Sequence, residues 1–271
     1  MAIIYADSSG DYDDGYIFEN TLTSIPDTRN ATSGTAIIQN NAGAPAYAQG
    51  IACGHGKIGF GDKIAIWRTV LSFDVSGESE NVLSVNLKIT SKSDNPSGVV
   101  TSIWNDETYV CKVTPVGSAW AATDFNSLDG WVDQESSWAG VATQYATAFT
   151  NTASTTHTIA LNATAISHLN SFIGTSDRFH LMLLHSDDFE YIVGEDALGD
   201  PEATSIILTA LDGGFFWDAS AATTPTLRPQ LDITYGDPPI GYSHDVAGVG
   251  SSNISTINGV ATANISKIIG V

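Results

Sequence analysis

Two stretches of alternating apolar residues, Ile64–Val75 and Val82–Thr90, constrain the fold of this chain more than any other feature. Successive side chains of a β-strand point to opposite faces of a sheet, so a period of two predicts strands here. The intervening SGESEN is polar and turn-forming. The first stretch is apolar on both faces near its start, which predicts a central position in a sheet.

Further short strand-like segments are spread over the rest of residues 1–236. One short helix is predicted, because Asn162 can cap it, apolar residues recur with helical spacing, and Gly174 can end it. We therefore expect an all-β, jelly-roll-like β-sandwich with one short helix over residues 1–236. Its core should contain large apolar residues from four strands: Trp67, Leu71, Phe73, Val85, Leu87, Leu181, Leu183 and Ile233.

Arg68 lies within the first strand, on the face opposite Trp67. Because this strand is apolar on both faces, the guanidinium should be buried, and a buried charge must be paired. We expect a carboxylate or several carbonyls around Arg68, in a structural rather than a catalytic role.

The same strands carry a resemblance to a known family. The residues concerned are Arg68, Leu71, Phe73, Asp74, Val85, Leu87 and Ile89, with an opening at 14–17 and 29–34 and a closing strand at 228–235. This pattern resembles DNRLRE-type domains, which are β-sandwich modules similar to carbohydrate-binding modules. Such domains are found in secreted bacterial proteins and in phage virion proteins, and the resemblance implies a role of one of these kinds.

The charge balance of the chain indicates which classes of partner it could bind. The chain has 30 acidic residues against 10 Lys and Arg, a formal net charge of −20. This argues against a nucleic-acid partner, because phosphate backbones are bound mainly by Lys and Arg.

Residues 1–14 do not resemble a signal peptide, and no run approaches the ~20 apolar residues of a membrane span. We expect a protein that stays in the cytoplasm or is assembled there into a particle, unless a signal peptide has been removed.

Cys53 and Cys111 are expected to be buried thiols rather than a disulfide.

After Tyr235 the sequence changes character. Residues 237–271 form a linker followed by an 11-residue repeat, in which 253–260 matches 264–271 and a fainter copy precedes them. Each unit is too small to bury its own apolar residues, so it must pack on something else. Such tails resemble C-terminal segments of phage virion proteins, and a floppy apolar tail is the alternative. The expected assembly residues are Val246, Val249, Ile254, Ile257, Val260, Ile265, Ile268 and Val271.

Catalytic signatures are missing from the sequence. The six histidines lack metal-ligand spacing, and no Gly-x-Ser-x-Gly elbow occurs. A carboxylate pair for glycoside hydrolysis would be invisible here, because it is defined by a distance in space. We expect a non-enzymatic protein.

Acidic residues gather in a Gly/Ser loop near the N-terminus, namely Asp7, Asp11, Asp13 and Asp14. Their oxygens are the ligands that calcium prefers. A structural calcium ion is one interpretation of this loop, and a solvated acidic loop is the other. No other cofactor is expected.

Tryptophans beside acidic residues have the composition of a sugar-binding surface. They are Trp120, Trp131 and Trp138 in one long segment, and Trp217 further on. Under this interpretation a cell-surface glycan would be a partner. The alternative is that these rings pack their segment onto the sandwich.

The tail and the N-terminus favour one function among three. We expect a virion structural protein of a bacteriophage, either a capsid decoration protein or a fibre subunit, assembled in the host cytoplasm. Its partners would be other virion proteins and further copies of itself. The alternatives are a carbohydrate-binding module of a secreted bacterial protein and, less favoured, a polysaccharide-cleaving enzyme.

Overall fold

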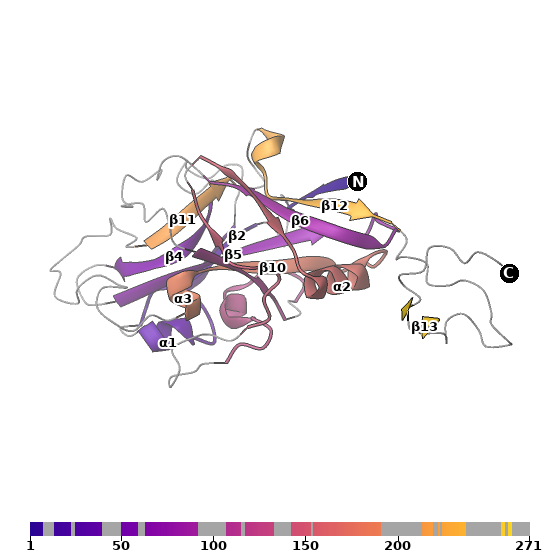
Figure 1. Ribbon diagram of the computed structural model, residues 1–271. Coiled ribbons are helices and arrows are strands. Elements are labelled where there is room, and N and C mark those ends of the chain that lie inside the picture. Colours follow the sequence, from indigo (N-terminus) through magenta and orange to yellow (C-terminus); the bar gives the residue numbers. More distant parts are fainter. Residues whose placement is uncertain are drawn as a thin grey trace, which may run out of the picture.

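The computed structural model describes residues 1–7, 14–22, 25–39, 50–58, 63–91, 107–114, 117–132, 142–152, 154–190, 213–218, 222, 224–236, 256–257 and 260–261. They form two antiparallel sheets with short helices around them (Figure 1). The all-β prediction is therefore confirmed. Most of the C-terminal repeats lie outside the described residues.

The first sheet has four strands in the order β1-β12-β6-β9. They are Ala2–Tyr5 (β1), Gln230–Tyr235 (β12), Val82–Thr90 (β6) and Thr156–Ala160 (β9). The register places Leu231 opposite Leu87 and Ile233 opposite Val85, so apolar residues of neighbouring strands share one face. The predicted strands around residues 82–90 and 230–235 are thus paired with each other.

The second sheet is larger and has the order β11-β4-β5-β10-β7-β8, with β2 and β3 attached to β5. Its strands are Gly213–Asp218 (β11), Gly50–Ile58 (β4), Lys63–Asp74 (β5), Arg178–His185 (β10), Glu107–Lys112 (β7), Phe149–Thr150 (β8), Gly15–Glu19 (β2) and Ala36–Gln39 (β3). β5 pairs with β4, β10 and β2, which confirms its predicted central position.

An apolar cluster lies between the two sheets. It contains Leu71 and Leu181 from the second sheet and Leu87 and Ile233 from the first, all fully buried. Seven of the eight predicted core residues belong to it. The prediction for Trp67 is wrong, since this residue is only partly buried and belongs to neither apolar cluster.

A second apolar cluster covers the opposite face of the larger sheet. It takes the alternate residues of the same strands, such as Val70 of β5 and Met182 of β10, together with Phe125 and Phe189 from outside the sheet. The larger sheet therefore has a buried apolar layer on each face, which is why its two central strands are apolar at successive positions.

The described helices are all short. They are Ile25–Arg29 (α1), Ala163–Phe172 (α2), Ser186–Glu190 (α3) and the 3₁₀ helices Ala122–Asn126 (η3) and Pro225–Leu227 (η4). The predicted helix is α2, and the Asn162 side chain accepts its capping hydrogen bond from the Ala165 N–H at 3.0 Å. Sequence analysis missed α1 and α3, because five residues are too few for a helical period. At ten residues, α2 is the longest described helix, and none of these helices could cross a bilayer.

Within the C-terminal repeats the structure describes one small hairpin. Its strands are Thr256–Ile257 (β13) and Val260–Ala261 (β14).

Candidate functional site

Arg68 is the centre of a buried polar cluster. Its side chain is fully buried, and its Nε and Nη2 donate to the two carboxylate oxygens of Asp188 at 2.6 and 2.8 Å. Nη1 donates to the carbonyl of Phe125 at 2.7 Å, and Nη2 to the carbonyl of Arg29 at 2.9 Å. The prediction of a buried Arg68 paired with a carboxylate and carbonyls is confirmed.

This cluster joins three segments to the outer face of the larger sheet. Arg29, at the end of α1, is also buried and donates to the carbonyls of Asp188 and Phe189 in α3. The guanidinium carbons of Arg29 and Arg68 lie 4.8 and 5.1 Å from the ring centre of Trp131. α1, η3 and α3 therefore converge on one guanidinium. A charge so enclosed suits a structural role better than contact with a ligand.

The tryptophans expected to bind sugar are engaged with the protein where the structure describes them. Trp131 donates from its indole N–H to Asn30 Oδ1 at 3.1 Å and packs on the arginine cluster. Trp120 is 4% exposed and donates to Ser72 Oγ at 2.7 Å. Both rings thus pack their segment onto the larger sheet, which was the alternative interpretation. Trp138 and the side chain of Trp217 lie outside the described residues.

The two ends of the acidic loop near the N-terminus are close together. The Asp14 N–H donates to the Asp7 carbonyl at 3.3 Å, while the Asp7 carboxylate pairs with Nε of Arg178. Burial raises the pKa of Asp7, and Arg178 opposes this rise. Asp11 and Asp13 lie outside the described residues. Among the residues that are described, no group of three His, Cys, Asp or Glu side chains is placed to hold a metal ion.

Cys111 is a buried free thiol, as predicted. Burial raises its pKa far above the ordinary range, so the thiol is unreactive at neutral pH. The side chain of Cys53 lies outside the described residues.

A pocket of about 310 Å³ opens where strands β7 and β10 separate. Lys112 and Leu181 form the last pair of the ladder in this direction, and Val113 then bridges Leu128 instead. Gly174, with a φ of 72°, lies in the turn that brings the chain from α2 back into β10. The pocket is lined by Lys112, Val113, Thr114, Gly117, His168, Phe172, Ser176, Asp177, Arg178 and His180.

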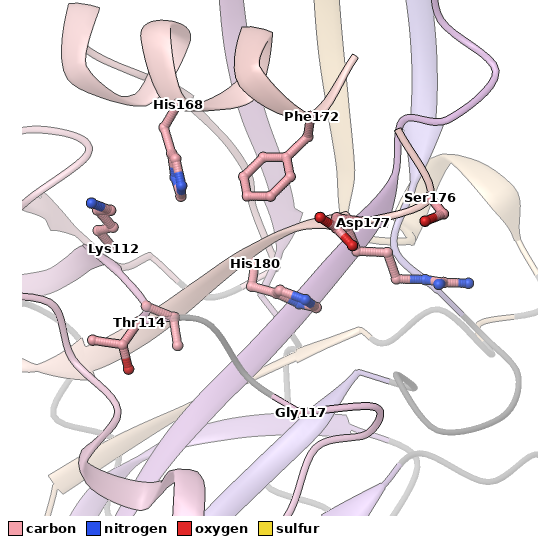
Figure 2. A pocket seen from close by; sticks show the side chains of 10 residues that line it. Lys112, Thr114, Gly117, His168, Phe172, Ser176, Asp177 and His180 are labelled. Carbon is pink, nitrogen blue, oxygen red and sulfur yellow. The ribbon is translucent and has the colours of Figure 1, made fainter. Parts of the chain in front are cut away.

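Two elements supply the principal side chains of this pocket. His168 and Phe172 are four residues apart on α2 and therefore share a face of the helix. Figure 2 shows them projecting from the helix toward the space that His180 and Thr114 border from the other side. Arg178 and His180 are two residues apart on β10 and point to the same face of the strand.

A buried hydroxyl fixes the orientation of the His180 ring. Its Nδ1 lies 2.8 Å from Ser72 Oγ, which also accepts the indole N–H of Trp120. The Ser72 hydroxyl therefore lies between the indole N–H of Trp120 and the imidazole of His180. Burial, with help from Arg178, lowers the pKa of His180 to about 4.

His168 is held in the same way by a second hydroxyl. Tyr145, which is fully buried, bonds through its hydroxyl to Nδ1 of His168. Burial raises the pKa of Tyr145, so the phenol keeps its proton at neutral pH. Burial also lowers the pKa of His168. At neutral pH both imidazoles are thus uncharged.

The cations of the pocket are already paired. Lys112 Nζ lies 3.4 Å from Asp129, and Arg178 contacts Asp7 and, at 3.8 Å, Asp74. A hydrogen bond from Thr143, at 2.7 Å, lowers the pKa of Asp129. A pair of hydrogen bonds from Ser76 lowers that of Asp74. These carboxylates therefore stay ionised and hold the two cations in place.

Sequence analysis did not select this pocket. Its residues come from 112–117, 168–172 and 176–180, and no motif spacing connects them. The one local signal was the amphipathic helix that carries His168 and Phe172. The tyrosine and serine hydroxyls that orient the rings come from yet other segments.

The sequence matches no protein-family model, and none of the curated proteins resembles it significantly.

Proposed function

We propose that this chain is a non-enzymatic structural protein of a bacteriophage virion, with a jelly-roll-like sandwich over residues 1–236 and an assembly tail over residues 237–271. The contrast between the two parts supports this. The described strands of the sandwich bury most of their large apolar residues, although Ile3, Tyr5 and Leu83 are exposed. The repeats instead carry regularly spaced Ile and Val, with Lys267 as the only charged residue of 246–271. Such a segment is stabilised by packing on another surface.

The observation that carries the proposal is the pairing inside the repeat unit that begins at Asn253. β13 and β14 are antiparallel, with Ile257 opposite Val260. The connecting Asn258-Gly259 is the dipeptide that two-residue hairpins favour. A lone two-stranded hairpin is at best marginally stable in water. A neighbouring sheet edge or apolar groove would complete it, with main-chain hydrogen bonds supplying much of the affinity.

The sandwich would face solvent on the particle, as a capsid decoration protein or a fibre subunit. A net charge of −20 keeps such a surface soluble, and salt screens the repulsion between copies. The expected partners are other virion proteins and further copies of this chain, not nucleic acid.

Truncation tests the proposal. The full chain and a chain ending at Gly236 should be compared by sedimentation, thermal melting and incorporation into particles. We expect the truncated chain to keep its melting temperature but to lose self-association and incorporation. A truncated chain that still assembles would contradict the proposal, as would one that no longer folds.

A point substitution in the tail provides a finer test. Ile257→Asp places a charge on an apolar repeat position, whereas Thr256→Asp places the same charge on its polar neighbour. Assembly should be lost with the first change and largely kept with the second. Equal effects would mean that the apolar repeat is not the contact surface.

A further inference from the structure

The edge of the first sheet that β9 forms is open among the described residues. β9 pairs with β6 on one side, and no described strand lies on its other side. Just past β9, the Leu161 N–H donates to the Val85 carbonyl at 3.0 Å, so the odd-numbered residues of this segment face β6. Hydrogen-bonded residues alternate along an antiparallel strand. The backbone groups that point away from β6, toward the edge, are therefore those of Thr156, Thr158 and Ala160.

This edge lacks the charges that often protect an edge strand. Exposed edges are commonly blocked by Lys and other charged residues, by Pro or by a bulge. The chain has 30 acidic and 10 basic residues, but none of them lies within 136–176, the stretch that contains β8, β9 and α2. Burial lowers the pKa of His157, the one titratable side chain of β9, so this strand is uncharged at neutral pH.

The opposite edge of the first sheet is less open. Its strand β1 leads into the second sheet, where Ala6 bridges Phe73 of β5 and the Asp7 N–H donates to the Ser72 carbonyl at 2.9 Å. β5 thus covers part of that edge. β9 offers the longer row of backbone groups, and an extended segment added there would continue the sheet by main-chain hydrogen bonds.

The C-terminal tail carries the alternation that this edge requires. A strand added to β9 would continue both faces of the sheet. β9 presents small exposed residues on its outer face and Ile159, part of the cluster between the sheets, on its inner face. In the hairpin, Thr256 pairs with Ala261 and Ile257 with Val260, so small residues share one face and large apolar residues share the other. The hairpin can therefore extend both faces of β9 with residues of matching character.

The charge of the tail also suits a contact between two copies. Residues 246–271 contain Lys267 as their only charged side chain, whereas the whole chain has a net charge of −20. Two such chains repel each other, and the repulsion is least where neither surface is charged. Contact between the tail and the uncharged stretch 136–176 meets this condition.

The position of the hairpin favours a second copy as its acceptor. Gly236, the last described residue before the hairpin, donates its N–H to the Asn81 carbonyl at 3.1 Å, beside the start of β6. Residues 237–255 can span at most about 60 Å, which is enough to reach a neighbouring molecule. Figure 1 shows the hairpin beyond the end of β12, apart from the two sheets of its own chain.

We propose that the β13–β14 hairpin of one copy adds to the β9 edge of a second copy. This inference rests on the proposed function and names the surface that accepts the tail. Because donor and acceptor are different surfaces, each copy can give its tail to one neighbour and receive the tail of another. A head-to-tail contact of this kind produces a ring or a filament.

The test is a complementation between two full-length variants. Thr158→Pro removes an N–H from the open edge and none from the ladder with β6, and proline is tolerated in edge strands. Ile257→Asp disables the tail and leaves the edge intact. In sedimentation velocity, each variant alone should self-associate at least about tenfold more weakly than the unsubstituted chain. Mixing labelled Thr158→Pro with unlabelled Ile257→Asp should restore association, because the first supplies the tail and the second the edge.

A matched control and a second measurement accompany this test. Thr158→Ala changes the same side chain but keeps the N–H, so it should weaken association far less than Thr158→Pro, at an equal melting temperature. Hydrogen exchange needs no substitution and decides the question even if Thr158→Pro does not fold. The amides of β9 that point to the edge should exchange at least about tenfold more slowly in the associated chain than in the diluted, monomeric chain.

Two results would overturn this proposal by themselves. One is a full chain that stays monomeric over the whole dilution series. The other is a mixture of the two variants that does not associate although the unsubstituted chain does, since the tail would then bind its own chain or another surface. The proposed function fails separately, if the chain ending at Gly236 still assembles. If assembly needs the tail but Thr158→Pro and the exchange of the β9 amides show no effect, only the inference about β9 is wrong.

Discussion

Replacing Arg68 with methionine would leave the carboxylate of Asp188 buried without its bidentate partner. Both side chains are fully buried, and the change also removes the donors to the carbonyls of Phe125 and Arg29. Removing one member of a buried ion pair costs about 3–5 kcal/mol. Since a domain has about 5–15 kcal/mol of stability in total, Arg68→Met should remove a large share of it.

Urea unfolding measures this effect directly. With an m-value of roughly 3 kcal/mol/M, the midpoint should fall by more than about 1 M. The matched control is Arg178→Met, which makes the same chemical change where the arginine side chain is 28% exposed and should cost about 0–1 kcal/mol. In the double variant Arg68→Met/Asp188→Leu the loss should be smaller than the sum of the single losses. A loss below about 1 kcal/mol for Arg68→Met would refute the view that this cluster holds α1, η3 and α3 on the sheet.

Two further predictions concern the core and the histidines. Leu87→Ala should lower the free energy of unfolding by about 2–5 kcal/mol in denaturant melts, because this side chain is fully buried between the sheets. The control is Leu83→Ala on the same strand, where the side chain is 44% exposed and the loss should be less than about 1 kcal/mol. Similar losses at both sites would contradict the assigned register. The depressed pKa of His180, about 4 against about 6.5 in the unfolded chain, means that the unfolded state binds the proton first as the pH falls. The free energy of unfolding should therefore decrease by roughly 1–3 kcal/mol between about pH 6.5 and 4. His180→Gln should make this decrease smaller, and an unchanged pH profile would show that His180 is not buried in its neutral form.

The periodicity of the sequence predicted most of the interior of the fold. Leu71, Phe73, Leu181 and Leu183 were placed in the core from their alternation, and they fill the space between the sheets. Trp67 follows the same alternation and yet is only partly buried. Alternation identifies the face on which a residue lies, but the extent to which the opposite sheet covers that face depends on the packing. Among the described residues of β5, those that belong to the cluster between the sheets are Leu71 and Phe73.

For Arg68, the sequence predicted burial and the need for a partner, but it did not identify that partner. Its burial, and its need for a partner, followed from its place in a strand that is apolar on both faces. The identity of the partner did not, because Asp188 is 120 positions away in the sequence and lies in a short helix that no pattern predicted.

The sequence by itself determined the features that depend on neighbouring residues: the alternation of the strands, the cap of α2 by Asn162, and the repeats of the tail. Only the tertiary structure decided the pocket. Ser72 and His180 are 108 positions apart, and Tyr145 and His168 are 23 apart. The geometry of the pocket follows from the point at which β7 leaves β10 and from the packing of α2 beside them. Such contacts arise from the packing of whole elements, so no spacing along the chain encodes them.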